Sequence, residues 1–476
     1  MLENCSPADV FYYFEQISAI PRGSGNSRQI ADYIEAFAGD RGLYCERDAY
    51  DNVIIKKPGT APQEDAPAVM LQGHLDMVCE KVPESSHNFL SDPLPLETDG
   101  KYVWSRGTTL GADDGIAVAM MLAILHDTSA LHPPLECVFT SDEEIGLIGA
   151  QNLDLSGCRA RYLINLDCDE DGVFIAGCCG GVRVRYRIPL RRNHSSGRGR
   201  RLILHGLRGG HSGAEIHKNG GNAVRLMGRL LSAVDRGSYA LVSVKGGDKD
   251  NVIPARCEAV ILGDGDFSSA FSALQREYQD REPDLQLTEE DMGEVETDVL
   301  TDESQAHLLR FLTQVPCGVL SMHPDIEGLV GTSANLAAVE TGKDCACGTV
   351  SVRSETGKQR DAVCVQISSL LVSMDGSEQR DGAYPGWAYN GKSKLRRTMV
   401  ETWQEMFSEV PKVEVIHAGL ECGVLQSKMP GLDIVSFGPA ITGIHTPAER
   451  LDIASVEKNY RFLLKVLTKL GRNGDA

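Results

Sequence analysis

Five short stretches of the sequence combine histidine or acidic residues with glycine or a strand end, and each could place a metal ligand in a turn. The stretches are GHLDMV at 73–78, GADDG at 111–115, SDEEIG at 141–146, NLD at 165–167 and GIHTPAE at 443–449. Their metal-capable side chains include two imidazoles and three carboxylates, a mixed set of donors that zinc, cobalt or manganese can use. Such a set predicts hydrolytic chemistry in which metal ions activate water.

The number of donors fits a pair of metal ions that share one carboxylate. Two metals about 3.5–4 Å apart need a bridging ligand, and each metal needs further ligands of its own. We predict Asp113 as the bridge, with His74 and Asp167 on one metal and Glu144 and His445 on the other. The predicted cofactor is therefore two divalent cations per chain, with zinc expected first and cobalt or manganese as alternatives.

Two further acidic residues fit supporting roles in the same reaction. Asp76 lies two residues after His74, so both side chains point to the same side of an extended segment, and Asp76 can orient the imidazole. A general base must lie beside the activated water without being a ligand, which favours Glu143 next to Glu144. Taken singly, a strand-end histidine is more often structural and an acidic pair more often a solvated turn. Five such stretches in one chain favour a shared site.

The elements expected to position these residues alternate between strands and helices. Short apolar runs at 68–73, 135–140 and 162–166 are typical of buried strands, and 115–125 has the small and apolar residues of a buried helix. This alternation predicts an α/β domain with a mostly parallel sheet covered on both faces. Because ligands bind beyond the carboxyl ends of such strands, polar residues that follow several strands can converge on one pocket.

A different pattern begins near Gly180 and indicates an inserted α+β domain. The basic stretch 191–201 is predicted to be a solvated loop or hairpin tip, and 241–244 is predicted to pair with 252–262 as a hairpin. Helices are expected at 221–234 and 359–372, and the recurring strand-pair-and-helix pattern suggests an internal duplication. We predict a first domain formed by 1–182 and 383–476, with 183–382 inserted into it. A helix at 393–407 and a strand at 432–437 are expected to complete the first domain.

Length, charge and cysteine content restrict the classes of protein. A chain of 476 residues is too long for one ordinary core. Its formal net charge of −20 disfavours a nucleic-acid partner. No apolar run of about 18 residues predicts a membrane span. The first residues have no basic region before an apolar segment, which argues against a secretory signal and for the cytoplasm. The 14 cysteines are then expected to be reduced thiols.

The sequence resembles the M20 family of metallopeptidases over nearly its full length, and most closely the aminoacyl-histidine dipeptidase branch. Besides the five stretches above, the resemblance rests on GLRGGHSGAEIHKNGGNA at 206–223, NVIPARCEA at 251–259, SVRS at 351–354 and IHAGLECG at 416–423. The combination is specific, whereas a single GHLD or DEE is not. The resemblance implies a split catalytic domain with dinuclear metal, an inserted lid domain, and hydrolysis of short peptides such as Xaa-His dipeptides.

The resemblance also implies functional residues in the inserted domain. His211 would polarise the scissile carbonyl, and Asn251 and Arg353 would hold the terminal carboxylate or backbone of the peptide. From the residues alone, His211 could equally be a loop histidine and Arg353 a surface arginine. The family commonly has asparagine after the bridging aspartate, where this chain has Asp114. The additional negative charge leaves the metal affinity and pH optimum open.

The resemblance bears on assembly as well. The inserted region of about 200 residues is about twice the lid of simpler family members, which borrow the lid histidine from a second subunit. A doubled lid could supply that histidine within one chain, so we leave monomer and homodimer open. If His211 acts within its own chain, mixing inactive His211→Ala and Glu143→Ala chains is expected to restore no activity.

Two other functions stay open at this point. A related tripeptidase or an N-acyl amino acid deacylase would use the same architecture. A non-catalytic peptide-binding relative is expected to have lost a metal ligand or the base, whereas all six positions are filled in this sequence.

Overall fold

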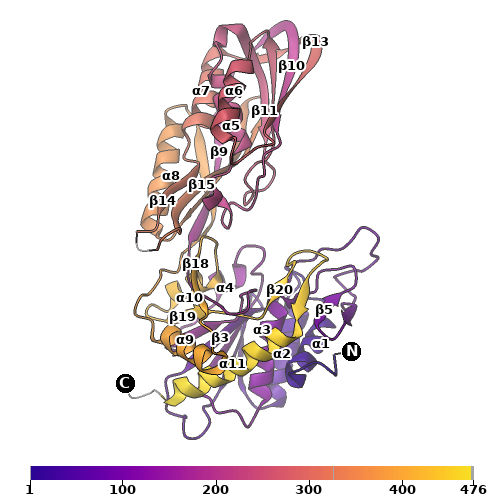
Figure 1. The fold of residues 1–476 in the computed structure, drawn as a ribbon, viewed down its shortest axis with the longest axis vertical. Helices are drawn as coiled ribbons and strands as arrows, with labels where there is room; N and C mark the ends of the chain where they lie inside the picture. Colours follow the sequence, from indigo (N-terminus) through magenta and orange to yellow (C-terminus); the bar gives the residue numbers. More distant parts are fainter. Residues whose placement is uncertain (1, 325, 473–476) are drawn as a thin grey trace. The chain divides into compact units, whose positions relative to one another are not determined.

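The computed structural model describes residues 2–324 and 326–472, which fold into two units (Figure 1). The first, here called the split unit, is assembled from three parts of the chain: Met1–Cys178, Tyr389–Val415 and Leu420–Ala476. The second, called the inserted unit, consists of Cys179–Ala388 and a short return of the chain at Ile416–Gly419. The sequence did not indicate that return.

The split unit contains helices and strands in alternation. In chain order they are α1 (Ala8–Ser18), α2 (Arg28–Asp40), β1 (Tyr44–Arg47), β2 (Val53–Lys57), β3 (Val69–His74), β4 (Leu96–Thr98), β5 (Tyr102–Ser105), α3 (Ala112–His126), β6 (Leu135–Thr140), α4 (Ile148–Asn152), β7 (Tyr162–Asn165), β8 (Val173–Cys178), α9 (Lys394–Phe407), β18 (Lys412–Ile416), α10 (Glu421–Lys428), β19 (Asp433–Ser436), β20 (Ile441–Thr442), β21 (Arg450–Asp452) and α11 (Ile453–Arg472).

The main sheet of the split unit has eight strands in the order β1-β2-β6-β3-β7-β19-β8-β18. Strands β6, β3, β7 and β19 run parallel in its centre, while β1, β2 and β8 pair antiparallel. Strands β3 and β6 are buried along their whole length, as expected for parallel strands covered on both faces. The fold is therefore α/β with its parallel strands concentrated in the middle of the sheet.

Helix α3 is buried on all sides and carries the turn that contains Asp113. Its residues from Gly115 to Leu125 are all buried and are mostly alanine, methionine, leucine, isoleucine or valine, which explains why the helix packs inside the unit rather than on its surface. It lies in one apolar core with residues of α1, β3, α9 and α11. A small sheet of β20, β21, β5 and β4 completes the split unit.

The inserted unit contains one long sheet and helices that pack against it. Its elements are β9 (Gly180–Pro189), β10 (Arg192–His205), η1 (Ile216–Lys218), α5 (Ala223–Ser232), η2 (Arg236–Ser238), β11 (Tyr239–Gly246), β12 (Cys257–Gly263), α6 (Ser268–Tyr278), β13 (Gln286–Leu300), α7 (Asp302–Gln314), β14 (Gly318–Met322), β15 (Val330–Thr341), β16 (Cys345–Ser354), α8 (Gly357–Val372) and β17 (Ser377–Tyr384). The strands lie in the order β13-β10-β12-β11-β15-β16-β9-β17, with β14 beside β15.

Helices α5, α6, α7 and α8 share one apolar core with the sheet of the inserted unit (Figure 1). The predicted pairing of 241–244 with the segment after it is confirmed, since β11 and β12 are antiparallel neighbours. The strand after the turn begins only at Cys257, so Asn251 lies in the connecting loop and not in a strand. Within the described residues, no helix is long and apolar enough to cross a membrane.

The prediction of a solvated loop at 191–201 is wrong. Residues 192–201 belong to β10, which pairs antiparallel with β13 along fourteen residues. The basic side chains meet acidic side chains of β13: Arg198 with Asp291, Arg200 with Glu289, and His194 with Glu296 and Asp298. Opposite charges on paired strands stabilise a sheet, and the sequence alone did not reveal that an acidic strand follows about ninety residues later.

Candidate active site

Asp113 lies between two histidines in the split unit. Its Oδ1 is 3.2 Å from Nε2 of His74, and its Oδ2 is 3.2 Å from Nε2 of His445. Nε2 of His445 is also 2.8 Å from Oε1 of Glu144. On the other side, single ligand atoms of His74, Asp114 and Asp167 all lie within 4.8 Å of one another. The structure therefore gathers all five predicted metal-binding residues, with the two oxygens of one carboxylate facing two imidazoles.

The fold explains how these distant residues meet. His74 is the last residue of β3, Glu144 follows β6, and Asp167 follows β7, so three neighbouring parallel strands point their carboxyl ends at one place. Asp113 lies in the first turn of α3, and the Asp113–Asp114 peptide bond is cis. His445 is in the loop after β20, with a φ of 60° that few residues other than glycine adopt.

The cluster contains more carboxylates than groups that can neutralise them. Burial raises the pKa of Glu143 and of Asp167 well above the usual range, and the neighbouring acids raise both further. Hydrogen bonds with Asp113 and Glu144 raise the pKa of His445 to about 10. Burial lowers the pKa of His74, but hydrogen bonds with Asp113 and Asp76 raise it well above its usual value. Two histidines among so many acids form a donor set that fits divalent cations, whose binding would displace protons from the imidazoles.

Asp76 connects His74 to the turn after β6. Its Oδ1 is 3.4 Å from Nδ1 of His74, but its backbone carbonyl is closer, at 3.1 Å from the same atom. The carboxylate instead accepts the backbone N–H of Glu143 at 2.9 Å and of Glu144 at 3.3 Å, and the hydroxyl of Ser24 at 2.7 Å. Asp76 thus orients both His74 and the Glu143–Glu144 turn, a second task that the sequence did not suggest.

Glu449 is a residue of the site for which the sequence suggested no task. Its carboxylate accepts the backbone N–H groups of Leu110, Gly111 and Ala112 at 2.7, 2.9 and 2.8 Å, and that of Asp113 at 3.3 Å. These are the groups at the start of α3 that lack partners within the helix, and the helix dipole favours a negative charge there. Glu449 therefore fixes the turn of Asp113 to the loop that carries His445. It lies in the GIHTPAE stretch, but its partners are more than 330 residues away in sequence.

Replacing Glu449 with alanine is expected to weaken both the fold and the metal site. Glu449 is only 2% exposed, so the variant leaves several N–H groups buried without an acceptor. We expect a loss of about 1–3 kcal/mol in the free energy of unfolding, and metal binding about 10–100-fold weaker. Urea unfolding in chelator and competition with a chromogenic chelator measure the two effects. Glu457→Ala, on the surface of α11, is the matched control, and equal behaviour of both variants would contradict this role.

Arg22 connects the segment after β3 with the turn before α3. Its Nη1 donates to the carbonyls of Leu75 and Asp76 at 2.9 and 3.2 Å, and its Nη2 donates to the carbonyl of Gly111. The side chain is 1% exposed. A Cβ at Gly111 would lie 2.7 Å from Nη2, so this close approach, at a φ of 65°, requires glycine. The sequence alone did not reveal this role of Arg22, because no motif links it to Asp113.

Glu421 is a third buried charged residue whose role the sequence did not reveal. Its Oε2 accepts hydrogen bonds from the hydroxyl of Thr140 at 2.7 Å and the amide of Gln72 at 2.5 Å. Both partners lie at the carboxyl ends of the central strands, close in sequence to His74 and Glu143. Burial raises the pKa of Glu421 to about 7. Glu421 belongs to the stretch 416–423, which carries part of the family resemblance.

In the inserted unit, His211 is held in one orientation by its own loop. Its Nδ1 accepts the backbone N–H groups of Ala214 at 3.0 Å and Gly213 at 3.3 Å. A nitrogen that accepts hydrogen bonds carries no proton, so the proton of the neutral ring is on Nε2. Burial and the positive charge of Arg353 lower the pKa of His211. His211 is therefore a neutral imidazole that can donate a hydrogen bond through Nε2.

The other two predicted residues of the inserted unit lie near this loop. The backbone carbonyl of Asn251 accepts the N–H of Ser212 at 2.8 Å, and the side chain of Asn251 is exposed. Nη1 of Arg353 donates to the hydroxyl of Tyr384 at 2.9 Å. The inserted unit thus brings together a neutral donor, an amide and a guanidinium, a set that can bind a carbonyl and a carboxylate.

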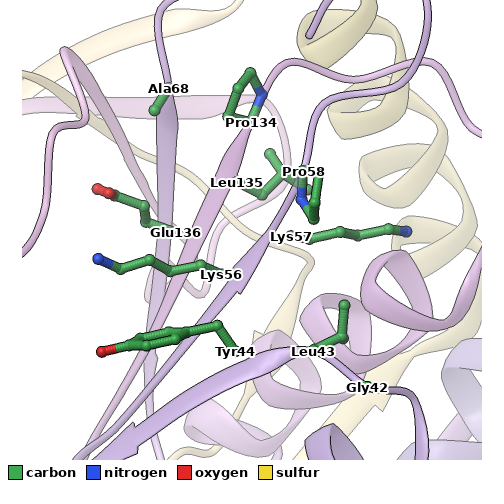
Figure 2. A pocket seen from close by; sticks show the side chains of 10 residues that line it. All are labelled: Gly42, Leu43, Tyr44, Lys56, Lys57, Pro58, Ala68, Pro134, Leu135 and Glu136. Atoms are coloured by element: carbon green, nitrogen blue, oxygen red, sulfur yellow. The ribbon is translucent and has the colours of Figure 1, made fainter.

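The split unit also has a cavity of about 340 Å³, whose lining residues are shown in Figure 2. Its lining includes Ala68 and Leu135, at the amino ends of β3 and β6, whereas the cluster lies at their carboxyl ends. Its two lysines already have partners, since Lys56 donates to the carbonyl of Gly157 and Lys57 to that of Ile124. Glu136 accepts backbone N–H groups of 159 and 160. The charged groups that line this cavity are therefore already hydrogen-bonded to the protein backbone.

Comparison with known proteins agrees with the geometry. Residues 70–469 match the model of peptidase family M20/M25/M40. The chain is 35% identical to the cytosol non-specific dipeptidase of Escherichia coli, over 98% of this chain and 99% of that protein. It is similar to the crystal structure of aminoacylhistidine dipeptidase from Vibrio alginolyticus, with a TM-score of 0.90, 32% identity and 98% of each chain covered. A tripeptidase from Staphylococcus aureus, at 16% identity and a TM-score of 0.58, shares the fold. The chain belongs to the M20 family of peptidases.

Proposed function

We propose that this protein is a dinuclear-metal dipeptidase that hydrolyses the peptide bond of short peptides, with Xaa-His dipeptides among its substrates. The observation that carries the proposal is Asp113, whose two carboxylate oxygens face two different histidines. The names of the two similar proteins, both dipeptidases, support the substrate class. The name of the E. coli relative supports a cytoplasmic location.

In this proposal Asp113 would be a ligand shared by two cations, with His74 and Asp167 as further ligands of one and Glu144 and His445 as further ligands of the other. Zinc is the first expectation, since mixed imidazole and carboxylate donors suit it, with cobalt and manganese as alternatives. When bound, the cations polarise the peptide carbonyl and lower the pKa of water. Asp76, Glu449 and Arg22 hold the ligands in place through the contacts described above.

Glu143 is the proposed general base. Its backbone is fixed by Asp76, and it is adjacent to Glu144 without sharing the contacts of Glu144 with His445. As the oxygen of water forms a bond to the carbonyl carbon, Glu143 accepts the proton that the water loses. The bond between carbon and nitrogen then breaks, and the same carboxyl group returns the proton to the departing amine.

The residues of the inserted unit are proposed to bind the peptide. His211 would donate from Nε2 to the carbonyl oxygen as negative charge develops on it, a role supported by the tautomer that its loop selects. Arg353 would pair with the terminal carboxylate, to which a guanidinium can donate two parallel hydrogen bonds. Asn251, with its exposed side chain, would bind the peptide backbone.

The proposal is tested by a substrate panel run with defined metals. The purified protein is treated with a chelator, supplied with zinc, cobalt or manganese, and assayed on Xaa-His and other dipeptides, tripeptides and N-acyl amino acids. We expect the chelator to abolish activity, metal to restore it, and dipeptides to be hydrolysed fastest. Faster hydrolysis of tripeptides or acyl amino acids would contradict the substrate class. Activity that changes neither on addition of chelator nor on addition of metal would contradict the mechanism. Peptide binding without hydrolysis would indicate a non-catalytic relative.

A further inference from the structure

The short return of the chain at Ile416–Gly419 places a histidine inside the inserted unit. The backbone N–H of Cys179 lies 3.2 Å from the carbonyl of Ile416 and 3.1 Å from that of Ala418, so both ends of the return are attached to the start of β9. Between them, His417 is only 8% exposed. His417 shares its surroundings with two residues of this unit, His211 and Arg353.

The ring of His417 contacts the strand that lies beside Arg353. Its Nε2 is 2.7 Å from Oγ of Ser333, and Ser333 is directly opposite Arg353 in the pairing of β15 with β16. Burial and the positive charge of Arg353 lower the pKa of His417 to about 4, and the backbone of Val330 only partly offsets them. A neutral imidazole is therefore held on the strand beside Arg353, where it adds no second positive charge.

The backbone of His417 contacts the loop that holds His211. A Cβ added to Gly213 would lie 2.6 Å from the carbonyl oxygen of His417 and 3.0 Å from Cε1 of His211. Real Cβ atoms do not approach a backbone oxygen so closely, so only glycine lets the loop pack against this carbonyl. This loop is the one whose backbone N–H groups, at Gly213 and Ala214, donate to Nδ1 of His211.

A buried imidazole at position 417 stabilises the folded state less than an apolar side chain of similar size would. Among the residues that the structure describes, Nδ1 of His417 makes no hydrogen bond of ordinary geometry, and the backbone of Val330 only partly compensates for its burial. A buried polar atom without a partner destabilises the folded state by about 1–3 kcal/mol relative to a satisfied one, and an apolar side chain would avoid that loss. This loss of stability indicates that the ring has a role besides packing, and its hydrogen bond with Ser333 is the contact that could provide one.

We propose that His417 is a positioning residue for the two peptide-binding groups of the inserted unit. Through its backbone it fixes the Gly213 loop, which keeps the proton of His211 on Nε2. Through Ser333 it fixes the strand pair that presents Arg353. The substrate side of this inference rests on the proposed function, but the orientation of His211 does not.

The first experiment measures the tautomer of His211 and needs no activity. The protein is labelled with ¹⁵N-histidine, and the ring nitrogens of His211 are assigned from the signals lost in His211→Asn. In the wild type we expect the Nε2–H tautomer. Gly213→Ala, which displaces the loop from the carbonyl of His417, and His417→Leu, which frees that carbonyl by removing the ring's hydrogen bond to Ser333, are expected to reduce its population. Gly197→Ala, at a position with nothing within 4 Å of the new Cβ, is expected to leave it unchanged. An unchanged tautomer in both variants would overturn the proposal.

The second experiment separates the two groups by kinetics. Gly213→Ala is expected to lower kcat by about tenfold to a hundredfold with little change in KM, since a small displacement of a catalytic donor can have such an effect. His417→Leu and the milder Ser333→Ala are expected to raise KM for a dipeptide by about tenfold, but not for the same dipeptide with an amidated carboxyl end. Ser369→Ala, on the surface of α8, is the control for Ser333→Ala.

The outcomes distinguish this inference from the proposed function. Folded variants, verified by unchanged melting temperatures, with wild-type kinetics on both substrates would overturn the positioning role. A KM that rises equally for the free and the amidated dipeptide would overturn the link to Arg353. Loss of the His211 tautomer in a protein that hydrolyses no dipeptide would support the positioning role while contradicting the proposed function.

Discussion

Replacing Glu143 with glutamine is expected to lower kcat for dipeptides by about 10²–10⁴-fold while leaving the fold and the metal content unchanged. Glutamine has nearly the same shape, and the backbone N–H of residue 143 can still donate to Asp76. The amide, however, cannot accept a proton from water or return one to the departing amine. Steady-state kinetics and the metal content per chain measure the two expectations separately.

Glu144→Gln is the matched comparison for this experiment. Glu144 is the neighbour whose Oε1 contacts His445, so its variant is expected to lose metal as well as activity. The pair of variants therefore separates a base from a ligand at adjacent positions. A Glu143→Gln protein within threefold of the wild type would mean that another group accepts the proton. A Glu143→Gln protein that has lost its metal would mean that Glu143 is itself a ligand.

The sequence was sufficient for those elements whose pattern is local. The run at 135–140 coincides with β6, because a strand buried on both faces is a short, mostly apolar segment, here bounded by Pro134 and Ser141. The helix predicted at 115–125 lies within α3, whose composition of small and apolar residues indicates burial on all sides. Because β3, β6 and β7 are parallel neighbours, residues that follow them must converge, and the gathering of His74, Glu144 and Asp167 could be expected from the order of the stretches alone.

The sequence was insufficient where a residue depends on a distant partner. The basic segment at 191–201 looks solvated until the acidic strand β13 is placed beside it. The role of Glu449 depends on its hydrogen bonds with the start of α3. The role of Arg22 depends on its hydrogen bonds with the carbonyls of Leu75 and Gly111. The return of the chain at Ile416–Gly419 is equally hidden, since no local pattern distinguishes four residues that pack with another unit. In each case the tertiary contact, and not the residue type, defines the role.

Asp113→Asn is the variant expected to damage the metal site most. A bridging ligand needs two oxygens with negative charge, and an amide offers only one oxygen, without charge. We expect the metal content to fall from two ions per chain to one or fewer. Activity is expected to fall by more than 100-fold, since even residues that only orient ligands are commonly worth about 10–100-fold. Metal analysis after dialysis and chelator competition measure the stoichiometry and affinity independently of any substrate.

Asp114→Asn is the control that makes this result specific to the bridge. Asp114 is the next residue, it is also buried, and its Oδ2 accepts the backbone N–H of His74 at 3.1 Å, which an asparagine oxygen can still do. The variant removes one carboxylate from the same cluster but leaves both oxygens of Asp113 between the two imidazoles. It is therefore expected to keep two metal ions. If Asp113→Asn retained two ions with the affinity of the wild type, Asp113 would not be a bridge, and the contacts with His74 and His445 would describe only a hydrogen-bonded carboxylate.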